Sequence, residues 1–62
     1  MQDPDIIDAA YATALGDLYK VLMISYTAAG GNRTVERQAD EAFRAGVALA
    51  RKVRDRARAL VA

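Results

Sequence analysis

Apolar residues along the first half of the chain recur at helical spacing and predict one long helix. Ile7, Leu18 and Leu22 fall on one stripe when successive residues are placed 100° apart. The stretch from 21 to 24 is apolar on every side of such a helix. One partner helix cannot cover a surface that wide. We therefore predict a helix over residues 4–29 that needs more than one neighbour.

The second half of the chain has a narrower apolar side and a broad charged side. Its apolar positions are spaced alternately by four and three, except where Arg56 stands in place of an apolar residue. This pattern is typical of a coiled-coil-like helix, which we predict over residues 33–61. Small residues in the middle would allow a close backbone approach or admit a large side chain. The apolar positions with this spacing are Val35, Ala39, Ala42, Gly46, Leu49, Val53 and Leu60.

A Gly-Gly-Asn sequence at residues 30–32 separates the two predicted helices. Gly30 suits the left-handed conformation that ends many helices, and Asn32 or Thr34 can cap the next one. At the start of the chain we expect Asp3 to cap the first helix, because its side chain can accept from free backbone N–H groups. The sequence therefore predicts an all-α fold, a single domain in which two helices form an antiparallel hairpin.

The size of the chain favours oligomerisation. A domain of 62 residues buries only about 60% of its unfolded surface, and such domains commonly need extra stabilisation. The chain has no cysteine and no histidine, so disulfides and thiolate or imidazole zinc sites are excluded. We predict a homodimeric four-helix bundle, with a larger ring or a complex with another protein as alternatives. The predicted oligomer interface comprises Ile7, Tyr11, Leu15, Leu18, Leu22, Tyr26, Phe43, Leu49, Val53 and Leu60.

Charge is distributed unevenly between the two predicted helices. Acidic residues dominate before the turn and basic residues after it. A pivot at Gly31 would bring Asp8 level with Arg54 and Asp17 near Arg44. Exposed pairs of this kind contribute only about 0 to 1 kcal/mol each. We interpret them as setting the antiparallel register and not as a major source of stability.

One row of arginines on the second helix is a candidate contact for a phosphate backbone. Arg37, Arg44, Arg51 and Arg58 recur every seven residues, which spaces them about 10 Å apart along a helix. Arginine is well suited to phosphate recognition. The alternative is an ordinary solvated helix face, which we favour because the net charge is only +1 and the isoelectric point is about 8.1.

The three tyrosines of the first helix, Tyr11, Tyr19 and Tyr26, share one broad side. Beside a row of arginines they could stack on bases. Tyrosines at helical spacing more often line a protein interface with their hydroxyls at its rim. We favour the interface interpretation.

The residue inventory does not favour an enzyme. Histidine and cysteine are absent, and the only serine, Ser25, falls on the apolar stripe. The glycines lack the spacing of a phosphate-binding loop. Neither the acidic residues at the start of the chain nor those around Asp40 match a metal motif. We expect no enzymatic activity, cofactor, metal or small-molecule substrate, unless groups such as Lys20 converge from several chains.

The start of the chain is acidic, unlike a secretory signal. The longest uncharged stretch, residues 21–32, is too short to span a bilayer. We therefore expect a cytoplasmic protein. The leading functional hypothesis is a non-enzymatic module for oligomerisation or protein–protein interaction, or a small accessory subunit. The alternative is a dimeric regulator that binds nucleic acid through its arginine row.

Overall fold

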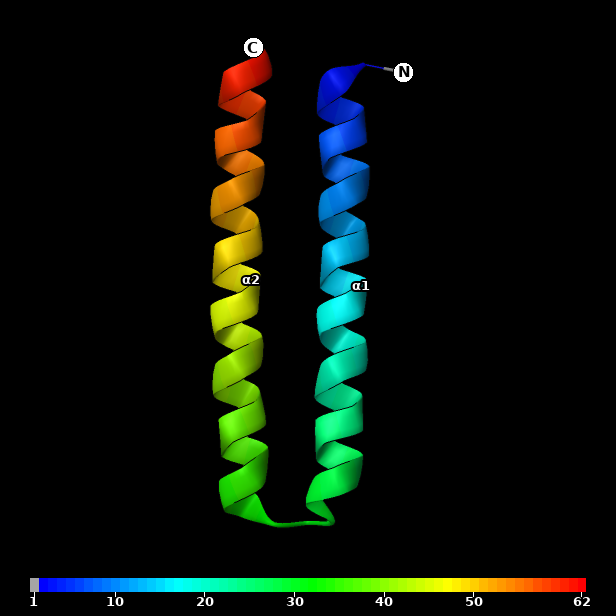
Figure 1. Ribbon diagram of the computed structural model, residues 1–62, viewed down its shortest axis with the longest axis vertical. Helices are drawn as coiled ribbons and strands as arrows, with labels where there is room; N and C mark the ends of the chain where they lie inside the picture. The colour runs from blue at the N-terminus through cyan, green and yellow to red at the C-terminus, as the bar shows by residue number, and fades with distance from the viewer. Residues whose placement is uncertain (1) are drawn as a thin grey trace.

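The computed structural model describes residues 2–62, and over this range it contains two α-helices and no strand. α1 spans Asp3–Ala29 and α2 spans Arg33–Val61. The helices lie side by side and antiparallel, so that α1 begins and α2 ends at the same end of the molecule (Figure 1). The predicted all-α hairpin is confirmed.

The turn between the helices depends on two glycines and one asparagine. Gly30 has φ 56° and ψ 35°, and Gly31 has φ 88°, in a region that side chains with a Cβ disfavour. The side-chain oxygen of Asn32 accepts hydrogen bonds from the backbone N–H groups of Thr34 at 3.0 Å and Val35 at 3.1 Å. Asn32 is therefore the cap of α2, one of the two candidates that the sequence offered.

The start of α1 differs from the prediction. Gln2 is the cap residue and makes no side-chain capping bond, while Asp3 already belongs to the helix. The carbonyl oxygen of Gln2 accepts from the N–H groups of Asp5 at 3.0 Å and Ile6 at 3.2 Å. Pro4 lies in the first turn, where its fixed φ suits the helix and its missing N–H costs no hydrogen bond. The acidic residues of this turn then act on the positive end of the helix dipole and not as caps.

Contact between the helices leaves no residue of the range 2–62 fully buried. The Cα atoms extend over 45 × 18 × 7 Å, a single layer two helices wide. On α1 the half-buried residues follow the predicted stripe: Ile7, Tyr11, Ala14, Leu15, Leu18, Leu22, Ser25 and Ala29. On α2 they are Glu36, Ala39, Asp40, Phe43, Gly46, Val47, Ala50, Arg54 and Ala57.

The register of the hairpin is shifted from the one expected for a pivot at Gly31. Leu18 lies against Gly46, and Asp8 pairs with Arg58, one helical turn beyond the expected Arg54. Side chains lean toward the N-terminus of their own helix. In an antiparallel pair the two leans are opposite, so contacting residues lie further along α2 than the backbone levels alone suggest. Asp8 and Arg54, which were expected to be level, therefore form no ion pair, although the charge of Asp8 acts on Arg54.

Candidate interaction surfaces

One face of the hairpin carries a continuous shallow groove between α1 and α2. Three adjoining hollows form it. The middle hollow shares the lining residues Ala14 and Val53 with the hollow on one side and Val21 with the hollow on the other side. We call this the apolar groove. The residues that line its two walls include Ala10, Ala14, Asp17 and Val21 of α1, and Ala42, Gly46, Leu49 and Val53 of α2.

Large apolar side chains in and beside the groove are exposed in the single chain. Val21 is 60% exposed, Leu49 62% and Val53 57%. Residues seven positions apart on a helix point in directions only about 20° apart. Three further exposed residues each lie seven positions from a residue that lines the groove, and they therefore point to the same side of their helix. They are Ile24, Val35 and Leu60. The groove and these three residues together form the apolar face.

Asp17 is the acidic residue in the wall of the groove. It lies beside Leu49 and Val53, and no ion pair joins it to Arg44 within residues 2–62. The expectation that Asp17 lies near Arg44 is wrong. Val53 of α2 lines the groove beside Asp17, and Arg44 is nine residues away from Val53. That spacing is two and a half turns, which places Arg44 on the opposite side of α2 from the groove.

The opposite face of the hairpin carries polar contacts between the helices, beside an apolar hollow lined by Tyr19, Met23 and Tyr26. The Tyr26 hydroxyl donates a hydrogen bond to Asp40 Oδ1 at 2.5 Å, and Arg58 pairs with Asp8 at 3.2 Å. Tyr26 is nine residues from Asp17, so it points away from the groove. The predicted arginine row lies on this side, which we call the arginine face: Arg37, Arg44, Arg51 and Arg58.

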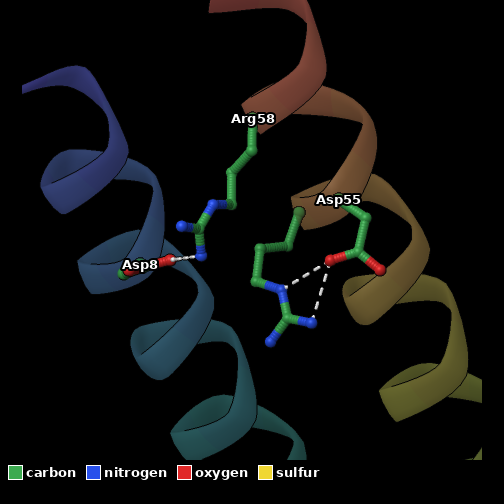
Figure 2. A network of polar contacts seen from close by, with 4 residues as sticks. Asp8, Asp55 and Arg58 are labelled. Atoms are coloured by element: carbon green, nitrogen blue, oxygen red, sulfur yellow. Dashed lines mark hydrogen bonds and ion pairs between the residues drawn. The ribbon is translucent and has the colours of Figure 1, made fainter. Parts of the chain in front are cut away.

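Two arginines connect the helices at the open end of the hairpin. Arg58 reaches from α2 to Asp8 of α1 (Figure 2). The Arg54 guanidinium carbon lies 4.4 Å from the centroid of the Tyr11 ring, a cation–π contact. Asp55 accepts from two nitrogens of Arg54, at 3.0 Å and 2.9 Å, and this hydrogen bonding raises the pKa of Arg54. Arg58, a candidate phosphate contact, is therefore engaged within the chain.

The environment of Tyr26 shows that acidic and basic groups both lie near its hydroxyl. Its hydrogen bond to Asp40 raises the pKa of Tyr26 above its ordinary value, and desolvation and the negative charges of Asp40 and Glu36 add to the shift. The positive charge of Arg44 acts in the opposite direction. Tyr26 and Arg44 are thus neighbours across the two helices. The sequence did not indicate this cluster, since its members lie on different helices.

The structure divides the predicted oligomer interface into two groups. Six of the ten residues are half-buried where α1 meets α2 of the same chain: Ile7, Tyr11, Leu15, Leu18, Leu22 and Phe43. Leu49, Val53 and Leu60 are exposed on the apolar face, and Tyr26 is exposed on the arginine face. Sequence reasoning did not select Val21 and Ile24, although they belong to the stretch that is apolar on every side.

No protein-family model matches the chain, and neither a curated protein nor a solved structure matches it. Over residues 2–62, neither helix combines the length and the apolar character that crossing a membrane requires. In the same range, no three acidic side chains gather where they could hold a metal ion. The apolar face and the arginine face are the candidate functional surfaces, on the geometry described above.

Proposed function

We propose that this chain is a non-enzymatic helical module for oligomerisation and protein–protein interaction, and that two copies pack through their apolar faces into a homodimeric four-helix bundle. One observation carries the proposal. The apolar face exposes large apolar side chains along its length, more of them than the opposite face, and no residue of the range 2–62 is fully buried. Ordering the chain has a large entropic cost, and burial of apolar surface is the main term that offsets it. A second copy would supply the missing burial.

The dimensions of the hairpin fit this arrangement. The broad face measures 45 by 18 Å between Cα extremes, so covering it would bury about 800 Å² on each chain, which is the size of a standard specific interface. Monomeric proteins rarely expose contiguous apolar patches beyond a few hundred Å². The hairpin is only one helix layer thick, so two copies would form the two layers of a bundle.

A matched pair of substitutions tests the proposal. Leu49 on the apolar face is 62% exposed, and Met23, which lines a hollow with Tyr19 and Tyr26 on the other side of α1, is 54% exposed. Each position in an isolated hairpin would tolerate a glutamate. If a second copy covers the apolar face, Leu49→Glu places a charge in an apolar interface and dissociates the dimer.

We expect sedimentation to give a dimer for wild-type protein and for Met23→Glu, and a dissociated, less helical chain for Leu49→Glu. Equal behaviour of the two variants would contradict the proposal. If both variants stay dimeric, the apolar face is not the interface. If both dissociate, the association covers both faces, as in a larger ring or a complex with another protein.

A second candidate function is the dimeric regulator that binds nucleic acid. The arrangement of the two faces is compatible with this function, because association through the apolar face would leave an arginine row on each outer side of the bundle. Tyr26 would lie beside it as a candidate stacking residue. The pairing of Arg58 with Asp8 competes with phosphate binding at one end of the row. We therefore rank this function second.

A further inference from the structure

Two symmetric arrangements can bring two apolar faces together. A two-fold axis parallel to the helices puts both turns at the same end and lays each α1 over the partner's α2. A two-fold axis across the helices puts the turns at opposite ends and lays α1 over α1 and α2 over α2. All neighbouring helices are antiparallel in both, so helix packing alone does not separate them.

We infer that the second copy docks with its turn at the same end, so that the acidic start of each α1 lies over the arginine-rich end of the partner's α2. This inference rests on the proposed function, because it specifies the partner and orientation for the same apolar face. Three observations carry it: the charge at the open end, the position of Asp17, and the sizes of the facing residues.

Charge complementarity favours the same-end arrangement. The first turns of α1 carry Asp3 and Asp5, and the last turns of α2 are rich in arginine. With both turns at one end, these opposite charges come to the same end of the bundle, where Arg56 lies at the edge of the apolar face and Arg58 on the outer arginine face. With turns at opposite ends, the basic end of α2 would lie over the start of the partner's α2, which carries Arg33 and Arg37. Like charges across an interface oppose association.

Arg56 illustrates the effect at one position. It interrupts the apolar spacing of α2 between Val53 and Leu60, and it has no ion-pair partner within residues 2–62. In the same-end arrangement the edge of the apolar face at Arg56 lies at the height of the first two turns of the partner's α1. An acidic group there gives this arginine a partner of opposite charge.

Asp17 argues against the opposite-end arrangement. α1 spans Asp3–Ala29, so an axis across the middle of the hairpin passes close to Gly16 and Asp17. Because Asp17 lies in the groove wall, such an axis would bring this carboxylate against its own copy from the second chain. Two like charges removed from water together are strongly unfavourable. In the same-end arrangement the two α1 helices are diagonal, and Asp17 faces α2.

The sizes of facing residues agree with the same-end arrangement. There, α1 meets the partner's α2 at the same heights at which it meets its own α2. Within one chain the groove joins Ala10 with Val53, Ala14 with Leu49, and Val21 with Ala42. Across the interface each pair would again match a large residue with a small one, which is how packed layers interdigitate.

Spin labels placed at the turn measure the orientation. The chain has no cysteine, so Arg33→Cys puts a single label at the start of α2. In the same-end arrangement the two labels lie on diagonal helices, whose axes are about 14 Å apart when neighbouring axes are about 10 Å apart. In the opposite-end arrangement they are separated by most of the 45 Å length of the hairpin. Pulsed electron resonance separates these distances.

Gly16→Cys is the matched control, because nothing lies within 4 Å of a Cβ at that position. It is near the middle of α1, so its labels are close in either dimer. Short distances for both variants support the inference. A short distance at residue 16 with a long one at residue 33 overturns it and leaves the dimer intact. Absence of an interchain distance in both variants means that the proposed dimer itself does not form, which overturns both.

Discussion

Leu18 of α1 occupies the space that a side chain at Gly46 of α2 would fill. An ideal Cβ at residue 46 would lie 2.5 Å from Leu18 Cδ2 and 3.3 Å from Cδ1. Gly16, by contrast, has open space around it, so the two helical glycines have different roles.

Gly46→Ala and Gly16→Ala should therefore differ in their effect on stability. Replacing glycine by alanine inside a helix stabilises it by roughly 0.5 to 1 kcal/mol. We expect that gain at Gly16. At Gly46 the displacement of the Leu18 methyl groups should cancel it, leaving a change near zero, and Gly46→Leu should destabilise by about 1 to 3 kcal/mol. Chemical denaturation measures these values. An equal gain from alanine at both positions would contradict the Leu18 contact.

Stability should depend on the ionisation of Tyr26 at alkaline pH. The hydrogen bond to Asp40 raises the pKa of Tyr26 above its ordinary value of 10.0, so the fold favours the neutral hydroxyl. Its contribution is complete below the unfolded pKa and is lost as the pH rises through the folded pKa. The free energy of unfolding of wild type should exceed that of Tyr26→Phe at neutral pH, and the difference should shrink above about pH 10. A difference that is constant with pH would refute the assignment.

The ion pair at the open end should couple Asp8 to Arg58. Both side chains are about half exposed, at 52% and 50%, so a double-mutant cycle with Asp8→Asn and Arg58→Gln should give about 0.2 to 1 kcal/mol, diminishing in high salt. The same cycle with Arg54→Gln in place of Arg58→Gln is the control. We expect weaker coupling there, because Arg54 contacts Tyr11 and Asp55 and interacts with the charge of Asp8 without a direct ion pair. Stronger coupling of Asp8 to Arg54 would show that the register is wrong.

The two helices and the turn could be predicted from local sequence signals, but the side of α2 that packs against α1 could not. Gly30 is of the residue type that ends helices, so the turn followed directly from the sequence, whereas the cap was left open between Asn32 and Thr34. Asp3 is of a residue type that often caps helices, but it lies inside the first turn of α1, after the cap residue Gln2. Counting residues from Gly31 gives the height of each Cα along the hairpin, whereas contacts also depend on the lean of the side chains. The expected ion-pair partner of Asp8 was therefore wrong by one helical turn.

For the candidate surfaces, spacing alone identified the arginine row and most of the apolar residues of α2. It could not show that the two lie on opposite faces of the hairpin, because that depends on which side of α2 packs against α1. The small residues Ala50 and Ala57 and the half-exposed Arg54 face α1, while the larger Leu49, Val53 and Leu60 do not. A seam chosen by hydrophobicity therefore selects the residues that remain exposed in one chain.

The hypothesis that the chain binds nucleic acid can be tested by the dependence of affinity on salt concentration. If the arginine row contacts phosphates, the logarithm of affinity for duplex RNA or DNA should fall steeply with the logarithm of salt concentration. Arg44→Ala with Arg51→Ala should make that slope shallower by about one unit per lost contact. Fluorescence anisotropy with labelled duplexes measures it. We expect weak binding that the two substitutions leave unchanged, which would leave the arginine face as a solvated surface or a protein contact.

We propose that the hairpin folds by associating with a second copy. Sedimentation equilibrium over a range of protein concentrations tests it most directly. We expect a helical species with twice the chain mass of 6.7 kDa, which dissociates on dilution with loss of helix, because folding and association are linked. A fully helical species that sediments at 6.7 kDa at every concentration would contradict it.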